Sequence, residues 1–381
     1  MGFLDRLRGV GAAPFHDFGY WGLGERLRIR RELAGLIDAR FLSQHADVVR
    51  RFEAQFCSAL GHRHAVAMNS GTTALLLALH HAGVGPGDVV LTVGNTWLTT
   101  MTVVHELGAT LRLVDIDART GMMDPAAVQA ALTPETRAIV PVHLYGSMAP
   151  MRELLALASP RGIAVIEDAC QAVGALLDGV PAGAWGDAAA FSFHTTKLVG
   201  APCDGGMLVT RRDDWAEPLR RSAVGDWDAG PERVQWRVPS RLPPLAVPFL
   251  GARLRGLQAR IAQRAEQHRR YHDAFAGQPG LQVLEVPAGV QSSHRNCIVL
   301  SPAKAAIEAA LRSARLPFDS LYGKSAALLQ ARGAAGHEAL PNTLRLAREH
   351  LALPLGRQMD RRVQQRVIDV VRRAHATGAA A

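Results

Sequence analysis

The sequence is poor in cysteine, in aromatic residues and in long apolar runs, and each shortage excludes a class of protein. Its four cysteines form no C-x-x-C pair, so neither a disulfide framework nor a zinc site is predicted, and we expect no metal. No apolar run approaches the roughly 18–20 residues of a membrane span. Charged residues also interrupt the N-terminal segment where a signal peptide needs a continuous apolar core. We therefore expect a soluble protein of the reducing cytoplasm with no membrane partner.

The charge of the chain is strongly positive, but its distribution is not that of a nucleic-acid-binding protein. The 381 residues include 43 Lys and Arg against 34 Asp and Glu, a formal net charge of +9. Arginines are scattered over helical patterns, and aromatic residues make up only 6%, so no basic stripe is interleaved with aromatic side chains. We expect no nucleic-acid partner. An enzyme whose substrate carries phosphates is compatible with the same charge.

Between about residues 65 and 210, short apolar runs alternate with helical patterns. Examples are VVLTV at 89–93 and IAVIEDA at 163–169. Such alternation predicts βαβ units and therefore an α/β fold with a mostly parallel central sheet flanked by helices. We expect a large domain over residues 1–250, with an N-terminal helical segment, and a smaller C-terminal α+β domain over 251–381. Residues 225–250 are predicted to form a functional or interface loop, and 250–275 one long amphipathic helix.

Lys197 stands four residues after the end of the apolar run AAAFSF at 188–193. A lysine in a cleft at the end of a buried strand is typical of enzymes that use the neutral amine as a nucleophile. The alternative is a lysine whose charged head extends from a loop into water, which is the commoner situation for a single lysine. The surrounding segments must decide between the two.

The segment NSGTTALLLAL at 69–79 predicts a helix whose first turn contains Gly71 and Thr72. Backbone N–H groups, a threonine hydroxyl and the helix dipole can together hold a phosphate dianion. An ordinary Ser or Thr N-cap without a ligand is the alternative.

Two further segments place functional groups at the carboxyl edge of the predicted sheet. Glu167 and Asp168 end a buried run, and open α/β sheets bind ligands at this edge, where a carboxylate needs a cationic partner. Trp97 follows the run VVLTV, and its flat indole could stack on a flat cofactor. A helix-capping Asp and a structural Trp are the alternatives.

A phosphate cradle, an acid for a ring nitrogen, a stacking aromatic and a lysine for an aldehyde together describe a site for pyridoxal phosphate (PLP). Here the chain resembles the DegT/DnrJ/EryC1/StrS family of sugar aminotransferases, which are fold-type-I PLP enzymes. The motifs SGTTALLLAL, VDID, AIVPVHLYG, VIEDACQAVGA, G-D-x-A-x-FSF-x-x-TK and GG-M-x-VT occur in the family order between about residues 30 and 375.

The resemblance implies a role for each residue of the site. Lys197 forms the Schiff base with PLP and later moves a proton during transamination, and Asp168 keeps the pyridine nitrogen protonated. The remaining cofactor contacts that it implies are those of Gln171 with the phenolate oxygen, Trp97 with the ring, and Gly71, Thr72 and Ser192 with the phosphate.

The resemblance also implies partners. It predicts a homodimer with the active site at the subunit interface, and transfer of an amino group from glutamate or glutamine to a keto-sugar that is nucleotide-linked. The lyase branch of the family has histidine where Lys197 stands, so the lysine favours transamination.

One position departs from the family pattern. Relatives usually carry Asn in an N-x-R motif that contributes to the phosphate site of the neighbouring subunit, whereas this chain has Pro239 before Ser240 and Arg241. Ser240 is a candidate replacement for the missing amide. The departure keeps two alternatives open: the same fold and cofactor acting on a cyclitol or another ketone, and a PLP-fold protein without catalytic activity.

Overall fold

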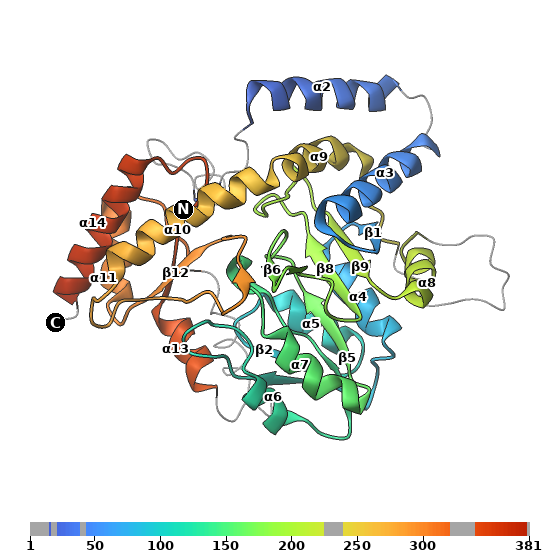
Figure 1. The fold of residues 1–381 in the computed structure, drawn as a ribbon, viewed down its shortest axis with the longest axis horizontal. Coiled ribbons are helices and arrows are strands. Elements are labelled where there is room, and N and C mark those ends of the chain that lie inside the picture. Colours follow the sequence, from blue (N-terminus) through green and yellow to red (C-terminus); the bar gives the residue numbers. More distant parts are fainter. Residues whose placement is uncertain (1–14, 17–20, 39–42, 225–238, 321–339, 379–381) are drawn as a thin grey trace.

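The computed structural model describes residues 15–16, 21–38, 43–224, 239–320 and 340–378. Its largest element is a seven-stranded sheet with the strand order β1-β9-β8-β5-β4-β2-β3 (Figure 1). β9 pairs antiparallel with both of its neighbours, and the other pairs are parallel. The strands are β1 (His64–Met68), β2 (Val89–Val93), β3 (Thr110–Val114), β4 (Thr136–Ile139), β5 (Ala164–Asp168), β8 (Ala188–Ser192) and β9 (Gly206–Thr210). The predicted α/β class is confirmed.

Helices cover both faces of this sheet, which explains why its strands are continuous apolar runs. All five residues of β2 and of β9 are buried. One hydrophobic cluster packs α4 (Gly71–His81), α5 (Leu98–Glu106) and α8 (Asp213–Val224) on one face. Another packs α3 (Ser43–Leu60), α6 (Pro125–Ala131), α7 (Met151–Ala158) and α9 (Val247–Arg255) on the opposite face. The result is a three-layer sandwich with the carboxyl ends of the parallel strands at one edge.

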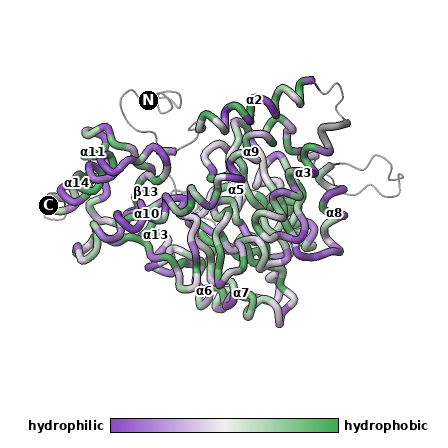
Figure 2. Tube along the Cα trace, turned by 45° about the horizontal axis from the view of Figure 1, so that its top comes forward, coloured by the Kyte–Doolittle hydropathy of each residue, from purple (hydrophilic) through white to green (hydrophobic). Residues whose placement is uncertain are grey.

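A smaller unit lies beside this sandwich. The antiparallel sheet β10-β12-β13 consists of β10 (Gln282–Val283), β12 (Cys297–Leu300) and β13 (His350–Leu353). It shares a separate core with α10 (Leu257–Phe275), α11 (Lys304–Ser313) and α14 (Arg361–Gly378). α13 (Pro341–Glu349) precedes β13. Hydrophilic segments lie mainly on peripheral helices such as α8, α11 and α14, and hydrophobic segments gather over the central sheet (Figure 2).

The chain crosses between the two units more than once. β11 (Val290–Gln291) pairs with β6 (Leu176–Leu177), which also pairs with β7 (Val180–Pro181). A short strand of the C-terminal half is therefore paired with the β6–β7 hairpin of the large unit, which follows β5. The domain boundary between residues 250 and 251 stays a prediction.

The segment 250–275 is two helices rather than the single helix that its periodicity predicts. α9 ends at Arg255, and α10 begins at Leu257. Gly256 caps α9, and a β-carbon built on it would lie 3.0 Å from a guanidinium nitrogen of Arg260. Gly256 therefore lies against the buried side chain of Arg260.

Two predicted features fall partly outside the described residues. Of the loop predicted over 225–250, residues 225–238 are not described; the remainder contains η4 (Pro244–Ala246) and the start of α9. The predicted N-terminal helical segment contains α2 (Leu23–Asp38) and α3. No helix in the described ranges is long and apolar enough to cross a membrane.

Candidate active site

Asp168 is the last residue of β5 and is 5% exposed. Thr100, on α5, donates its hydroxyl to Asp168 Oδ2 at 2.7 Å, and the backbone N–H of Cys170 donates to Oδ1 at 3.1 Å. Each carboxylate oxygen therefore has one protein donor. Because a carboxylate oxygen can accept more than one hydrogen bond, the group retains capacity for a cationic ligand.

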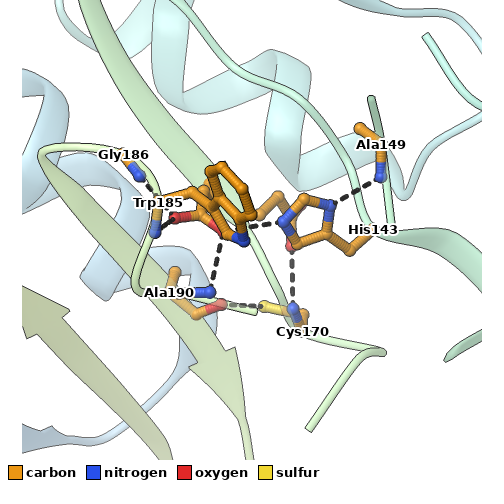
Figure 3. A network of polar contacts seen from close by, with 9 residues as sticks. His143, Ala149, Cys170, Trp185, Gly186 and Ala190 are labelled. Carbon is orange, nitrogen blue, oxygen red and sulfur yellow. Dashed lines mark hydrogen bonds and ion pairs between the residues drawn. The ribbon is translucent and has the colours of Figure 1, made fainter. Parts of the chain in front are cut away.

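Glu167, the preceding residue, projects to the opposite face of the sheet and is completely buried. Backbone N–H groups of Trp185 and Gly186 donate to its Oε1 at 2.9 and 2.7 Å, and that of Gly183 donates to Oε2 at 2.7 Å. His143 Nε2 lies 2.8 Å from Oε2. Figure 3 shows this network around the His143 ring.

The tautomer of His143 follows from its second contact. The backbone N–H of Ala149 donates to His143 Nδ1 at 3.1 Å, so Nδ1 carries no hydrogen and Nε2–H is the donor to Glu167. Burial raises the pKa of Glu167, but the hydrogen bonds from His143, Gly186 and Gly183 outweigh this effect, and the pKa lies below its ordinary value. Glu167 is thus a buried, ionised carboxylate whose donors are all supplied by the protein.

The N-terminus of α4 lies against the ends of β5 and β8. Ser70 caps the helix, with its Oγ accepting from Thr73 N at 3.1 Å. A β-carbon built on Gly71 would lie 2.6 Å from Cys170 Sγ and 3.2 Å from Ser192 Cβ. Only glycine allows the helix to approach so closely, and the approach brings Gly71 and Ser192 together beside Cys170, two residues after Asp168.

Thr72 and Trp97 belong to the same edge. Thr72 is half-buried in the first turn of α4. Trp97 is the N-cap residue of α5 and is 55% exposed, although it is a large aromatic residue. Thr100, one turn further along α5, is the donor to Asp168, so the same helix carries the indole and positions the carboxylate.

Lys197 lies in the loop after β8, half-buried, with its N–H donating to His194 O at 2.8 Å. Its charge acts on the Cys170 thiol. Burial and the negative charge of Asp168 raise the pKa of Cys170 well above its ordinary value, while the positive charge of Lys197 opposes the increase. The structure therefore places Asp168 and Lys197 around one thiol.

Gln171 is 5% exposed, and its Oε1 accepts from the backbone N–H of Tyr145 at 3.1 Å. This contact fixes the orientation of the amide and leaves its NH₂ group as the free donor. Tyr145, in η1 (Leu144–Gly146), has a φ of 61°, a conformation that is unusual for a non-glycine residue and concentrates at functional sites.

The segment around Pro239 does not present a replacement for the family amide. Pro239 is exposed, but Ser240 is 1% exposed, and its backbone carbonyl accepts from Asn69 N at 2.7 Å. The hydroxyl of Ser240 is buried within the chain, whereas Arg241 is exposed. In the part of the chain that the structure describes, no three His, Cys, Asp or Glu side chains are grouped to hold a metal.

Sequence reasoning missed three side chains of this region: Thr100, Cys170 and Arg295. The available signal for Thr100 was its spacing from Thr96 in the segment NTWLTT. The two threonines are one helical turn apart and therefore face the same side of a helix. Cys170 lies inside the EDACQ motif between two residues that the motif emphasises. Arg295, two residues before β12, is buried at 4% exposure and carries no motif that distinguishes it.

This geometry, an ordered acid and a lysine at the edge of a three-layer α/β sandwich, belongs to an aminotransferase class. The structure aligns with the crystal structure of S. venezuelae DesV in complex with a ketimine intermediate, with a TM-score of 0.86, 32% identity, and coverage of 92% of this chain and 95% of that chain.

The particular family follows from the sequence. Residues 25–372 match the DegT/DnrJ/EryC1/StrS aminotransferase family, and the chain belongs to that family. It is 37% identical over 365 residues to a dTDP-3-amino-3,4,6-trideoxy-alpha-D-glucose transaminase of Micromonospora megalomicea subsp. nigra, covering 91% of this chain and 96% of the relative. It is 34% identical over 362 residues to a UDP-N-acetyl-3-dehydro-alpha-D-glucosamine 3-aminotransferase of Acidithiobacillus ferrooxidans, covering 95% of each. The predicted family and aminotransferase activity are confirmed.

Proposed function

We propose that this aminotransferase uses PLP to move an amino group from glutamate or glutamine to a nucleotide-linked keto-sugar. The observation that carries the proposal is the convergence of Asp168, Lys197 and the N-terminus of α4 at one edge of the sheet. The residues fit the cofactor. Glycine at position 71 lets the start of α4 pack closely on Cys170 and Ser192, and the first backbone N–H groups of a helix can bind a phosphate.

Each predicted residue has a role that agrees with its surroundings. Gly71, Thr72 and Ser192 hold the phosphate, and the exposed indole of Trp97 packs on the ring. The free NH₂ of Gln171 donates to the phenolate oxygen, since its carbonyl is already occupied by Tyr145 N–H.

Asp168 holds a proton at the ring nitrogen. The Thr100 hydroxyl and the Cys170 N–H each donate to one of its oxygens and so keep its carboxylate oriented. When bound, PLP supplies an electron sink that stabilises negative charge on the carbon that loses its proton. Lys197 would remove that proton and return it to the carbon on the other side of the transferred nitrogen, which makes its amine the base and then the acid of the transfer.

The keto-sugar part of the proposal is supported by the relatives and by the charge of the chain. The relatives named above act on dTDP- and UDP-linked sugars. A net charge of +9 attracts a diphosphate from a distance, although it does not select a particular sugar.

A homodimer is the second part of the proposal. Large apolar side chains of α2 are exposed, with Leu23, Leu27 and Ile37 at 75, 57 and 76%. Leu245 and Trp97 are each 55% exposed on the large unit. Exposed apolar residues that gather on a surface mark protein contacts, and a two-fold related second copy is the commonest partner.

Replacing Lys197 with Ala tests the activity. The purified variant should lose the visible absorption of the bound cofactor and should transfer no ¹⁵N from labelled glutamate to any acceptor. Lys304→Ala is the matched control, because Lys304 lies on α11 in the smaller unit. A Lys197→Ala variant that keeps both signals would refute the assignment.

The acceptor is tested separately with wild-type protein. Labelled glutamate and labelled glutamine are offered with a panel of dTDP-, UDP- and GDP-linked keto-sugars, free cyclitol ketones and free 2-oxo acids. We expect ¹⁵N in a nucleotide-linked product. Transfer to free ketones alone would replace the keto-sugar with the alternative acceptor that Pro239 suggests.

A further inference from the structure

Arg295 lies immediately before β12 and is 4% exposed. Its Nε is shielded from solvent and has no hydrogen-bond partner. Its guanidinium makes no ion pair with any residue in the described ranges. A buried cation without a counter-charge is costly, and the cost usually signals a ligand or a partner group.

The backbone of Arg295 is held from two directions. A β-carbon built on Gly146 would lie 2.5 Å from Arg295 N, so this segment packs directly on η1. Ser293 N–H donates to Gly146 O at 2.8 Å, and Asn296 N–H donates to Tyr145 O at 3.2 Å. Arg264 donates to Arg295 O at 3.2 Å from α10. The side chain therefore starts from a fixed position.

This position is next to the lysine loop. Arg260, one helical turn before Arg264 on α10, donates to Leu198 O at 3.3 Å, beside Lys197. Desolvation first, and then the positive charges of Lys197 and Arg295, lower the pKa of His194, while Asp204 opposes them. Geometry and charge thus agree that Arg295 and Lys197 flank the same space.

The space is on the Gln171 side of Asp168 rather than on the phosphate side. Tyr145, whose carbonyl accepts from Asn296, also donates its N–H to Gln171. The phosphate cradle is formed instead by Gly71 and Ser192, which approach each other beside Cys170. An anion that meets Arg295 is therefore separate from the cofactor phosphate.

We propose that Arg295 binds the α-carboxylate of the amino-acid donor, an inference that rests on the proposed function. The α-carboxylate is attached to the carbon on which Lys197 acts, so a cation beside Lys197 meets it directly. The diphosphate of a nucleotide-linked sugar is a less suitable anion for this position, because the sugar ring separates it from the reacting carbon. A guanidinium matches a carboxylate with two parallel hydrogen bonds, and both groups are then neutralised in a dry site.

Comparing the two half-reactions, amino-group removal from glutamate and from the amino sugar, separates carboxylate binding from a structural role of Arg295. Arg295→Gln should lower kcat/KM for removal of the amino group of glutamate by about 10- to 100-fold, the effect of losing charge-assisted hydrogen bonds. Removal of the amino group from the nucleotide-linked amino sugar formed in the acceptor panel should change less than about twofold, because that substrate has no α-carboxylate. Arg295→Lys should recover part of the loss for glutamate.

Binding gives a readout that does not depend on turnover. Glutarate, a five-carbon dicarboxylate without an amine, is titrated into wild type and Arg295→Gln by calorimetry, and the variant should bind about tenfold more weakly or not at all. Arg112→Gln is the matched control, because Arg112 donates to Ala131 O at the β3 edge of the sheet. Circular dichroism checks that each variant is folded. If Arg295→Gln does not fold, the same titration is made with Arg295→Lys.

Equal losses in both half-reactions would make Arg295 a structural residue and overturn the proposal, as would no loss in either. Unchanged glutarate binding in the variant would also overturn it. A wild-type protein that transfers no amine from any donor would instead refute the proposed function, and the glutarate comparison would still decide the role of Arg295.

Discussion

Glu167 and Asp168 are adjacent on β5, yet their surroundings differ in one decisive respect. Glu167 is buried with four donors, three from the backbone of residues 183–186 and one from His143, all within the same chain. Asp168 has two donors, Thr100 and Cys170 N–H, and lies at the edge where α4 and the lysine loop meet.

The contrast shows how a fold separates a structural carboxylate from a functional one. A carboxylate whose hydrogen bonds are all satisfied internally ties loops to a strand and has nothing left to offer a ligand. A carboxylate that is oriented but only half satisfied is ready to bind a cation. Three predictions test this difference, and a fourth tests the phosphate cradle beside Asp168.

The largest effect is expected for Asp168→Asn. With its oxygen toward Cys170 N–H and its NH₂ donating to the Thr100 hydroxyl, the amide keeps both protein contacts. It cannot hold a proton on a pyridine nitrogen, so kcat for transamination should fall by about 10³-fold, or about 4 kcal/mol in the barrier. The free energy of unfolding should change by less than about 1 kcal/mol, because the protein contacts are retained. Steady-state kinetics and urea unfolding measure the two effects, and a large loss of stability with normal kcat would reverse the assignment.

Glu167→Gln should show the opposite pattern. Both carboxylate oxygens of Glu167 accept hydrogen bonds from N–H donors, and in Gln an NH₂ replaces one of these oxygens and faces its donors. The free energy of unfolding should therefore fall by about 3–5 kcal/mol, whereas kcat of the folded fraction should stay within about tenfold.

The same substitution has a pH signature. The pKa of Glu167 is lower in the folded protein than its ordinary value of 4.5, so its contribution to stability is present above that value and is lost as the pH falls through the folded pKa. Thermal unfolding between pH 7 and 3 should therefore show a steeper acid loss in wild type than in Glu167→Gln. Parallel curves would show that Glu167 is not ionised in the fold.

The smallest effect is expected at the phosphate cradle. Gly71→Ala places a methyl 2.6 Å from Cys170 Sγ, so it should destabilise the fold by about 1–3 kcal/mol and weaken PLP binding. Cys170→Ala removes the sulfur, and the double variant should recover part of the loss. PLP titration and thermal unfolding of the four proteins measure this coupling, and strictly additive losses would argue against the contact.

Much of the fold could be predicted because strands buried on both faces appear as continuous apolar runs. β2, β5 and β9 coincide closely with such runs. β4 is an instructive exception, since the run AIVPV at 138–142 extends past its end at Ile139. Pro141 lacks an N–H for the ladder and so explains why the run is longer than the strand.

The candidate site could be predicted only where function imposes a motif. The choice of Asp168 over Glu167 came from the family resemblance, because adjacent residues alternate between faces and the periodicity of the strand does not reveal which face holds the donors. Arg295 could not be predicted for a related reason. Its proposed role rests on the lack of a counter-charge among the described residues around it, and that surrounding is set by contacts between segments about 100 to 150 residues apart, such as that with Gly146.

The break at Gly256 has a mechanical consequence. α9 is packed on α2 and α3, whereas α10 continues as a rod into the core of the smaller unit. Through Arg260 and Leu198 O this rod is also fastened to the loop of the reactive amine. The same guanidinium also donates to Arg253 O of α9, so one side chain bridges the break and holds both helices against the loop that carries Lys197.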